Sequence, residues 1–385
     1  MDNKKDLISR YLEEIASKLD ITETMRSKAI SSYNAVGKEL GGIDNSLKVK
    51  IMPQGSFYLG TVIKPVSDKD EYDIDLVCLI DNMNEYSEYQ IKNCVGDRLK
   101  NSSRYAPMLE EEGKRCWTLQ YDEFHMDILP CVSNEYRYIE PNFTEIKLTH
   151  KITDNCYIPK YSNPYKYHQW FEERMQEQVN KAREKMVVMN SAEIKNVPLY
   201  EVKTTLQMAI QLLKRHRDIM YDKLPSGRKD NSPISIIITT LAAKAYKNEE
   251  NLYDAIENIV NHMEEYIYQE NGKFIIENPV MQSENFADKW NENPEKAKEF
   301  YLWINKARKD FNELLSESNG LPHFINRLED AFGKNIVQRA VVNIGESTRV
   351  AREKNSLYVE GLTGGLKTSS SENTKRVGVH TFFGK

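Results

Sequence analysis

The chain has 385 residues, of which 40% are hydrophobic and 29% are charged, and its formal net charge is −5 at pH 7. This composition is that of a globular protein long enough to hold two domains with substantial cores. The acidic balance argues against a protein that binds duplex nucleic acid through a broad basic face. It is compatible with mononucleotide substrates, which need only a few local cations.

The patterns of cysteine, histidine and hydropathy exclude further classes of protein. The five cysteines lack C-x-x-C spacing and the seven histidines are scattered, so we expect free thiols and no structural zinc. No apolar run approaches the length of a membrane span, and the charged N-terminus lacks a signal-peptide core. We therefore expect a protein of the cytoplasm with no membrane partner.

Two amphipathic helices are predicted first along the chain. Apolar residues recur at helical spacing over residues 4–19. Asp20 and Glu23 have the spacing of a capping box for a second helix, which we expect to end at Gly41. We expect both helices to pack on a sheet.

A half-exposed strand over residues 47–51 leads into the tripeptide Gln54-Gly55-Ser56. Glycine lets the backbone approach a triphosphate closely, and a helix that starts after it would offer N–H donors. We therefore expect Gln54, Gly55 and Ser56 to bind the phosphates of a nucleotide.

The segment 71–80 is predicted to be a strand with two apolar faces. Asp73 and Asp75 fall on the same face at its starting end, with Val77 and Leu79 deeper along that face. Burying two like charges without a partner costs several kcal/mol each. A pair of divalent cations is the partner that we expect.

Asp127 is a third acidic residue in a predicted strand, 124–131, which follows a helix over 86–99 and a strand over 116–121. Strands pair about 4.8 Å apart, so the three carboxylates converge if the two acidic strands are neighbours. Asp73, Asp75 and Asp127 would then hold two Mg²⁺ ions, with Mn²⁺ as an alternative. Two ions roughly 3.5–4 Å apart suit in-line attack of a hydroxyl on a nucleotide phosphate.

Residues 131–165 are expected to be irregular, and Ser162-Asn163-Pro164 is a turn signal before a helix. We place the crossing into a second, mainly helical domain there. The predicted fold is α+β, with a nucleotidyltransferase sheet domain of the polymerase-β type, a helical C-terminal domain, and the active site in the cleft between them. The predicted domains are residues 1–160, 161–345 and a flexible tail, 346–385.

The helical domain is predicted to centre on a helix over residues 199–220. Lys203 and Lys214 are three turns apart on nearly the same face, so one edge of this helix either presents cations to a cleft or is a solvated basic face. An apolar helix with the hydroxyl of Ser235 near its start is expected over 233–240. Further helices are expected over 251–269 and 294–315.

From Gly361 the chain is rich in glycine, serine and threonine, and we expect a flexible stretch as far as Lys375. The chain then ends in Phe382-Phe383-Gly384-Lys385. This aromatic end is either a short recognition motif or a tail that docks on the body of the protein.

Several of these motifs together resemble the bacterial cGAS/DncV-like nucleotidyltransferases, or CD-NTases, over roughly residues 1–330. They are, in chain order, Gln54-Gly55-Ser56, Asp73-Ile74-Asp75, Asp127, Ser162-Asn163-Pro164, Leu212-Leu213-Lys214-Arg215 and Pro233-Ile234-Ser235. Members of this family make cyclic di- or trinucleotide second messengers from nucleoside triphosphates in anti-phage (CBASS) defence. The resemblance implies the same activity here, with pyrophosphate released.

The resemblance also implies roles for single residues. Asp73 and Asp75 would hold both metal ions, and Asp127 would complete the site near the attacking hydroxyl. Gln54 and Ser56 would contact the donor triphosphate, and Lys214 and Ser235 would contact it from the helical domain.

The partners implied are nucleoside triphosphates, with ATP among them. The chain lacks the zinc-ligand insertion of the animal DNA sensor, so duplex DNA should not be required, and we expect a monomer. The aromatic tail resembles cyclase C-termini that a ubiquitin-transfer-like partner conjugates to targets, although Lys385 would first have to be trimmed from Gly384.

Two alternatives stay open at this point. One is an enzyme of the same fold that adds nucleotides to an RNA end or a protein side chain, and the other is a non-catalytic nucleotide-binding module. The bases used, the 3′–5′ or 2′–5′ linkage, the ring size and any activator are not determined by these patterns.

Overall fold

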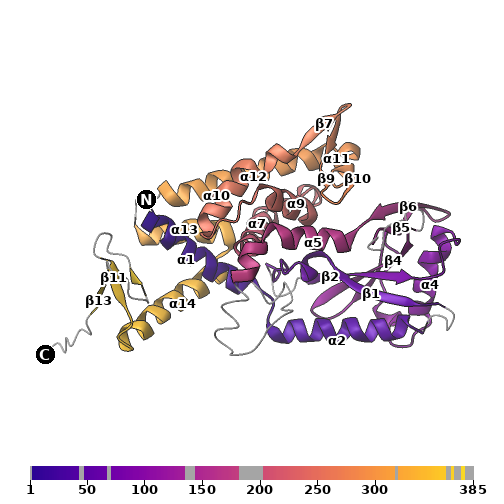
Figure 1. Ribbon diagram of the computed structural model, residues 1–385, viewed down its shortest axis with the longest axis horizontal. Helices are drawn as coiled ribbons and strands as arrows, with labels where there is room; N and C mark the ends of the chain where they lie inside the picture. Colours follow the sequence, from indigo (N-terminus) through magenta and orange to yellow (C-terminus); the bar gives the residue numbers. More distant parts are fainter. Residues whose placement is uncertain are drawn as a thin grey trace.

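The computed structural model describes residues 2–42, 47–66, 71–134, 144–181, 203–316, 320–360, 366–367 and 374–377. The molecule is elongated, with a sheet in one half and most of the helices in the other (Figure 1). The last residues, 378–385, lie outside the described residues, so the expected recognition motif at the aromatic end stays a prediction.

The sheet half has six strands among the described residues, in the order β1-β2-β4-β5-β6 with β3 also paired to β4. Their bounds are β1 Val49–Gln54, β2 Tyr72–Ile80, β3 Trp117–Gln120, β4 Phe124–Ser133, β5 Ile146–Thr153 and β6 Cys156–Ser162. The pair β2 and β4 is parallel, whereas the other pairs are antiparallel. The expectation that the two acidic strands are neighbours is therefore confirmed.

Strands β5 and β6 correct the prediction of an irregular segment over 131–165. Only Ile146, Leu148 and Thr149 of this hairpin are buried, so most of its residues face solvent and the apolar alternation is short. Pro159 also lies within β6, which is tolerated because β6 is an edge strand. The strand signal was therefore too weak to read locally.

Helices α2 (Glu23–Leu40) and α4 (Glu88–Lys100) cover one face of the sheet, as Figure 1 shows. The expected capping box at the start of α2 is wrong, because Thr22 is the N-cap and its hydroxyl accepts from the Met25 amide. Asp20 instead accepts from Lys203 and Gln211, which follow it by more than 180 residues.

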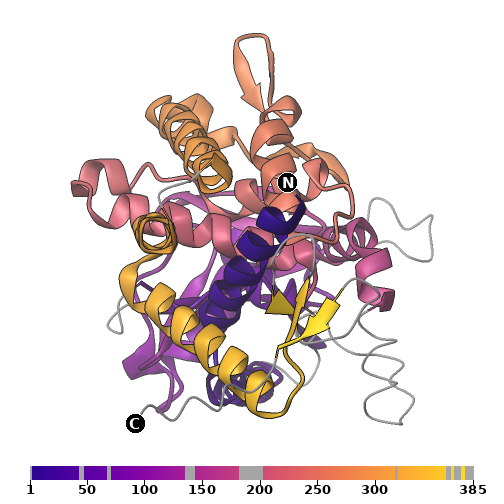
Figure 2. The ribbon, with the colours of Figure 1, turned by 90° about the vertical axis from the view of Figure 1, so that its left-hand side faces the viewer.

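Helix α1 (Asp2–Leu19) does not pack on the sheet, which corrects our expectation for the first of the two helices. Its apolar stripe, with Leu12 and Ile15 fully buried, belongs to the core of the helical half. It contacts α7, α10 and α14, and Figure 2 shows it among these helices. The predicted domain boundary at residue 160 stays a prediction.

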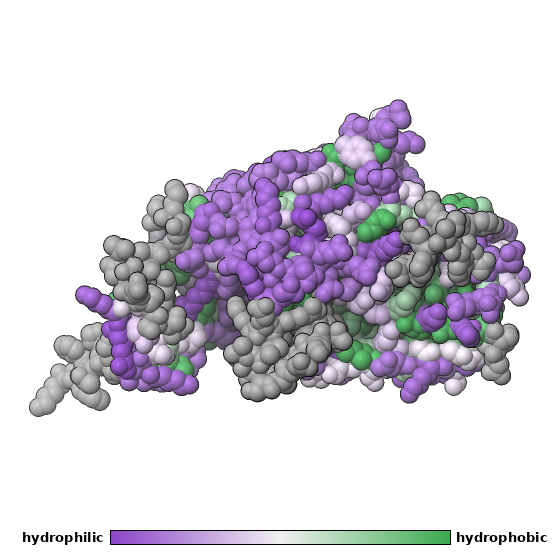
Figure 3. Space-filling model, in the orientation of Figure 1, coloured by the Kyte–Doolittle hydropathy of each residue, from purple (hydrophilic) through white to green (hydrophobic). Residues whose placement is uncertain are grey.

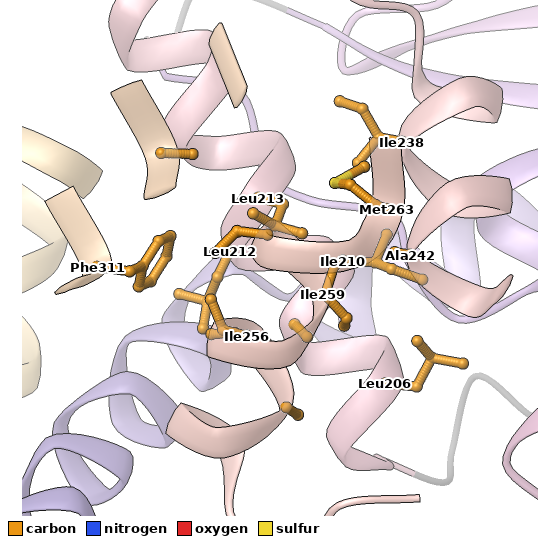
Figure 4. Packing of buried hydrophobic residues seen from close by; sticks show 14 of the residues in the cluster. Leu206, Ile210, Leu212, Leu213, Ile238, Ala242, Ile256, Ile259, Met263 and Phe311 are labelled. Atoms are coloured by element: carbon orange, nitrogen blue, oxygen red, sulfur yellow. The ribbon is translucent and has the colours of Figure 1, made fainter. Parts of the chain in front are cut away.

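The core of the helical half surrounds α7. The helices that build this half are α5 Pro164–Arg174, α7 Thr205–Asp222, α9 Ser235–Ala245, α10 Leu252–His262, α12 Glu295–Ser316, α13 Leu321–Phe332 and α14 Lys334–Glu353. Figure 4 shows Leu206, Ile210 and Leu213 of α7 packed with residues of α9 and α10. A helix buried on nearly all sides, such as α7, holds its polar side chains at fixed positions.

Short elements complete the fold around these helices. They are α3 Gly55–Tyr58, α8 Ser226–Lys229, β7 Tyr268–Glu270, β8 Lys273–Ile275, β9 Glu277–Asn278, β10 Met281–Asn285 and α11 Asp288–Glu292. The helix expected over 251–269 ends at His262, and the chain enters the β7–β8 hairpin. The helix expected over 294–315 is α12.

Helix α14 extends beyond the predicted start of the C-terminal tail. Helix α14 runs through residue 346, the predicted start of the tail, because Val337 and Ala340 anchor it to the core and Ala351 is also buried. Beyond it, β11 (Tyr358–Glu360) pairs with β12 (Leu366–Lys367) and β13 (Thr374–Arg376). Most of the stretch 361–375 lies outside the described residues, so its expected flexibility stays a prediction.

The helical half is mostly hydrophilic on the face seen in Figure 3, and apolar side chains gather over the sheet half. Among the described residues, no helix has both the length and the apolar composition needed to cross a bilayer.

Candidate active site

All eight residues that we predicted to act on nucleotide or metal line one cleft, which has a volume of about 440 Å³. The cleft lies between β2 and β4 of the sheet and helices α7 and α9 of the helical half. The predicted residues that line it are Gln54, Gly55, Ser56, Asp73, Asp75, Asp127, Lys214 and Ser235. Their roles in binding and catalysis stay predictions.

The acidic residues come together because of the register between β2 and β4. Asp75 lies directly opposite Asp127, and Asp73 lies two residues earlier on the same strand face. The Thr118 hydroxyl on β3 donates to Asp127 Oδ1 and so orients that carboxylate. Convergence of three carboxylates at one edge of the cleft follows from this register.

The surroundings of Asp73 and Asp75 raise the pKa values of both side chains. Burial, and then the charges of Asp127 and Asp73, raise the pKa of Asp75 to about 7. Desolvation and the Asp127 charge also raise the pKa of Asp73, although its side chain is more exposed than that of Asp75. A protein gains nothing from holding like charges together in this way unless a ligand neutralises them.

The donor set fits magnesium, with one qualification from the geometry. The three carboxylates supply hard oxygen ligands, which Mg²⁺ and Mn²⁺ prefer. In the part of the chain that the structure describes, however, no three acidic, histidine or cysteine side chains are gathered closely enough to form a ready-made cage. Mg²⁺ is commonly bound by one or two carboxylates plus substrate phosphates, so the residues present fit an ion that arrives with its nucleotide.

Position 55 requires a glycine because the chain there lies against Asp75 of the acidic strand. Its φ is +66°, and a Cβ at this position would lie 1.9 Å from Asp75 Oδ2. This proximity arises because Gln54 pairs with Asp75 between β1 and β2. A helix starts at this turn, as expected, but α3 has only four residues, Gly55–Tyr58. Binding of phosphate by Gln54, Gly55 and Ser56 stays a prediction.

The helical wall of the cleft carries a buried cation. Lys214 is 3% exposed, and its Nζ donates to the Thr61 carbonyl at 3.0 Å. Burial, and then the positive charge of Arg217, lower the pKa of Lys214 to about 7. At the start of α9, the Ser235 hydroxyl accepts from Arg217 at 3.1 Å.

A row of polar side chains on and before α7 binds the irregular segment 59–65. Each donates to a main-chain carbonyl of that segment: Gln207 to Leu59, Lys203 to Gly60, Lys214 to Thr61, Gln211 to Val62, and Arg215 to Lys64 and Pro65. The segment joins the Gly55-Ser56 turn to the acidic strand. The row therefore fixes the position of that turn against the helical half.

This row settles the two interpretations of the basic helix. Lys214 lines the cleft, as predicted, but Lys203 does not, because it pairs with Asp20 at 2.6 Å. The alternative of a solvated basic face is wrong, since Lys214 and Arg215 are both buried.

Sequence reasoning missed further residues of the cleft. The rings of Tyr58 and His168 stack there, with centroids 3.8 Å apart. Arg115, Glu284 and Phe286 also line it. They come from distant parts of the chain, and no local spacing connects them to the acidic motif.

Comparisons with known proteins identify the family to which the chain belongs. Residues 7–174 match the family described as Second Messenger Oligonucleotide or Dinucleotide Synthetase domain, or SMODS. A curated relative from Roseivirga ehrenbergii, named c-di-GMP synthase, is 30% identical over 395 residues, covering 99% of this chain and 98% of the relative.

Solved structures show the same fold. The CD-NTase CdnG of Bradyrhizobium diazoefficiens, in complex with GTP, aligns with a TM-score of 0.66 at 18% identity over 88% of this chain and 100% of that chain. The cyclic AMP-GMP synthase DncV of Vibrio cholerae, with a nonhydrolyzable GTP, aligns with a TM-score of 0.53 at 14% identity over 87% of each chain. The chain belongs to the cGAS/DncV-like nucleotidyltransferases, as its sequence motifs predicted.

Proposed function

We propose that this protein is a Mg²⁺-dependent synthase that joins two molecules of GTP into cyclic di-GMP and releases pyrophosphate. The observation that carries the proposal is the register of β2 and β4, which brings Asp73, Asp75 and Asp127 to one edge of a cleft. The relative named c-di-GMP synthase supports the choice of guanine and of a two-membered ring. Our expectation that ATP is one of the substrates stays a prediction, and this proposal favours GTP.

We assign metal binding and triphosphate binding to different residues of the cleft. Asp73, Asp75 and Asp127 would hold Mg²⁺, or Mn²⁺ in its place, which stabilises charge on the reacting phosphate and lowers the pKa of the attacking ribose hydroxyl. Lys214 and Ser235 bind the triphosphate from the helical wall, and Gln54 and Ser56 bind it from the sheet wall.

Because Gly55 has no Cβ, the Gly55-Ser56 turn can lie directly against the Asp75 carboxylate. After the first condensation, the linear product turns over in the same cleft, and its free hydroxyl attacks the second α-phosphate. The helical and sheet walls limit access of water to the triphosphate during both steps.

The biological setting is part of the proposal. We infer that the product is a second messenger in anti-phage signalling, made in the cytoplasm by a monomer that needs no duplex DNA. Conjugation of the C-terminal tail by a ubiquitin-transfer-like partner stays a prediction, since the last residues lie outside the described part of the chain.

The composition of the cleft disfavours an enzyme that extends RNA. Such an enzyme needs a basic path for the phosphate backbone. The charged residues that line this cleft are Arg115, Lys214, Asp73, Asp75, Asp127 and Glu284, so acids outnumber cations. The site suits a nucleotide that brings its own metal ions.

The test is incubation of purified protein with radiolabelled GTP, ATP, CTP and UTP singly and together with Mg²⁺, followed by phosphatase and chromatography. We expect a phosphatase-resistant product with GTP alone, and none from a variant with Asp73→Ala and Asp75→Ala. Asp97→Ala is the matched control, because Asp97 is exposed on α4. Products that lengthen when RNA is added would instead support the RNA-directed alternative.

A further inference from the structure

Glu284 is a carboxylate of the cleft that the acidic site on β2 and β4 does not explain. It lies on β10, in the helical half, and lines both the cleft and an adjoining hollow of about 300 Å³. Burial raises the pKa of Glu284, which means that its ionised form is destabilised there. Hydrogen bonds from a ligand would offset this cost.

One oxygen of Glu284 is held firmly and the other is not. Ser162 Oγ donates to Oε2 at 2.9 Å, and Asn278 Nδ2 donates to the same oxygen at 2.7 Å. Within the described part of the chain, Oε1 accepts no hydrogen bond. Two side chains from different elements thus fix the orientation of a carboxylate that keeps an acceptor for something else.

The surroundings of Glu284 suit a flat, polar ring. Phe286, two residues further on, lines the same cleft and hollow and offers an apolar face. Arg115 also lines the hollow, where it pairs with Asp288 at 3.6 Å and its charge opposes the rise in the pKa of Glu284. Arginine is also a common donor to the O6 and N7 acceptors of guanine.

An ionised carboxylate accepts hydrogen bonds and cannot donate them. Guanine is the base whose Watson–Crick edge carries two adjacent donors, N1–H and the N2 amino group. In adenine and cytosine the amino group neighbours an acceptor nitrogen, and in uracil a single N–H lies between two carbonyls. A carboxylate directed at a base edge therefore favours guanine and repels the other bases.

We propose that Glu284 selects guanine by accepting from its N1–H and N2 amino groups, with Ser162 and Asn278 as positioning residues that orient the carboxylate. This inference rests on the proposed function and deepens it, because it names the group that sets the base. It concerns one of the two bound nucleotides, the one whose base enters the hollow beside Phe286.

The first experiment compares GTP, inosine triphosphate and ATP with the wild-type protein. Inosine triphosphate lacks only the N2 amino group, so it removes one of the two donors. We expect kcat/KM to fall about tenfold or more from GTP to inosine triphosphate, and further for ATP. Equal use of GTP and inosine triphosphate would overturn the proposal.

The second experiment uses Glu284→Gln, with Glu270→Gln as the matched control, because Glu270 is exposed on β7 outside the cleft. The amide keeps the shape of the side chain but presents a donor beside an acceptor. We expect Glu284→Gln to lose about 10- to 100-fold in kcat/KM for GTP and to lose the preference for GTP over inosine triphosphate, while the control keeps both. A variant that retains the wild-type preference contradicts the proposal.

Equilibrium binding separates this inference from the proposed function. Nonhydrolysable GTP and its inosine and adenosine counterparts are titrated into wild type and both variants, with thermal unfolding to verify folding. If the wild type makes no cyclic product but binds the guanine analogue best, and Glu284→Gln abolishes that preference, the function fails and the role of Glu284 stands. If the wild type binds all three analogues equally, the role of Glu284 is refuted whatever the product.

Discussion

The two walls of the cleft hold charged and polar groups in opposite ways. On the sheet wall, Asp73 and Asp75 face like charge, and no ion pair joins them to a cation of the described residues. On the helical wall, the polar side chains on and before α7 donate to main-chain carbonyls of the segment 59–65. The acids of β2 are therefore held against like charge, whereas these donors on and before α7 have carbonyl partners within the protein.

This difference distinguishes residues that serve the reaction from residues that stabilise the fold. An acid held against like charge weakens the metal-free fold until a ligand neutralises it. A buried donor with a carbonyl partner instead stabilises the fold and positions the chain around it. Substitutions on the sheet wall should therefore affect activity and leave or raise stability. Substitutions on the helical wall should lower both.

Asp75→Asn should have the largest effect on activity. It removes a proposed metal ligand, and we expect product formation to fall about 10³-fold or more. Because the neutral amide relieves repulsion from Asp73 and Asp127, the free energy of unfolding in EDTA should stay the same or rise. Urea denaturation measures it, with Asp97→Asn as the control, and a clear loss of stability would break the contrast between the walls.

Gly55→Ala should lower both activity and stability, because the added Cβ meets Asp75 Oδ2 and the backbone is left-handed. Gly272→Ala is a matched control, since its φ of +75° is similar but nothing lies within 4 Å of the added Cβ. The left-handed backbone alone costs about 1–2 kcal/mol. Urea denaturation should show a larger loss for Gly55→Ala, and equal losses would mean that Asp75 does not restrict this position.

Gln211→Leu tests the helical wall. Gln211 Nε2 donates to the Val62 carbonyl and to Asp20, both at 2.8 Å. Asp20 keeps Lys203 as a donor, but the change removes the Gln211 donor from the carbonyl of the buried Val62. We expect a loss of about 1–3 kcal/mol in the free energy of unfolding. We also expect a higher KM for GTP, because the Gly55-Ser56 turn is held less firmly.

Gln338→Leu on α14 is the control for this substitution, since Gln338 is exposed. Stability should not change by more than about 0.5 kcal/mol in that variant. A Gln211→Leu protein with wild-type stability would show that the polar row does not support the segment 59–65.

The pH dependence of stability gives the smallest and most specific difference. Because the pKa of Asp75 is raised to about 7 in the folded protein, its contribution to stability is fully present below the unfolded pKa of about 4 and is lost as pH rises to 7. Burial of Lys214 acts in the opposite direction above pH 7, so the comparison is confined to pH 4–7.

The measurement is urea denaturation of wild type and Asp75→Asn in EDTA across this range. Wild type should lose stability relative to the variant as pH rises. Parallel curves would mean that Asp75 titrates normally in the folded protein.

Some features were predictable because they depend on local spacing. The period-2 alternation of Asp73 and Asp75 with apolar residues identified β2 and its acidic face, and Gly55-Ser56 marked the turn beside it. The capping signal at Asp20 shows how such reasoning fails. Its spacing with Glu23 favoured a cap, but Lys203 and Gln211 occupy its carboxylate, and Thr22 caps α2 instead.

By itself the sequence determined the kind of chemistry, because the acids, the glycine and their strand are encoded within a few residues of one another. Tertiary structure decided where α1 packs, that α7 binds the segment 59–65, and that Ser162 and Asn278 meet at Glu284. These contacts join residues far apart in the chain, so no local sequence pattern predicts them. They depend on which surfaces the whole fold buries together, since a buried polar group must find its partner wherever the fold places one.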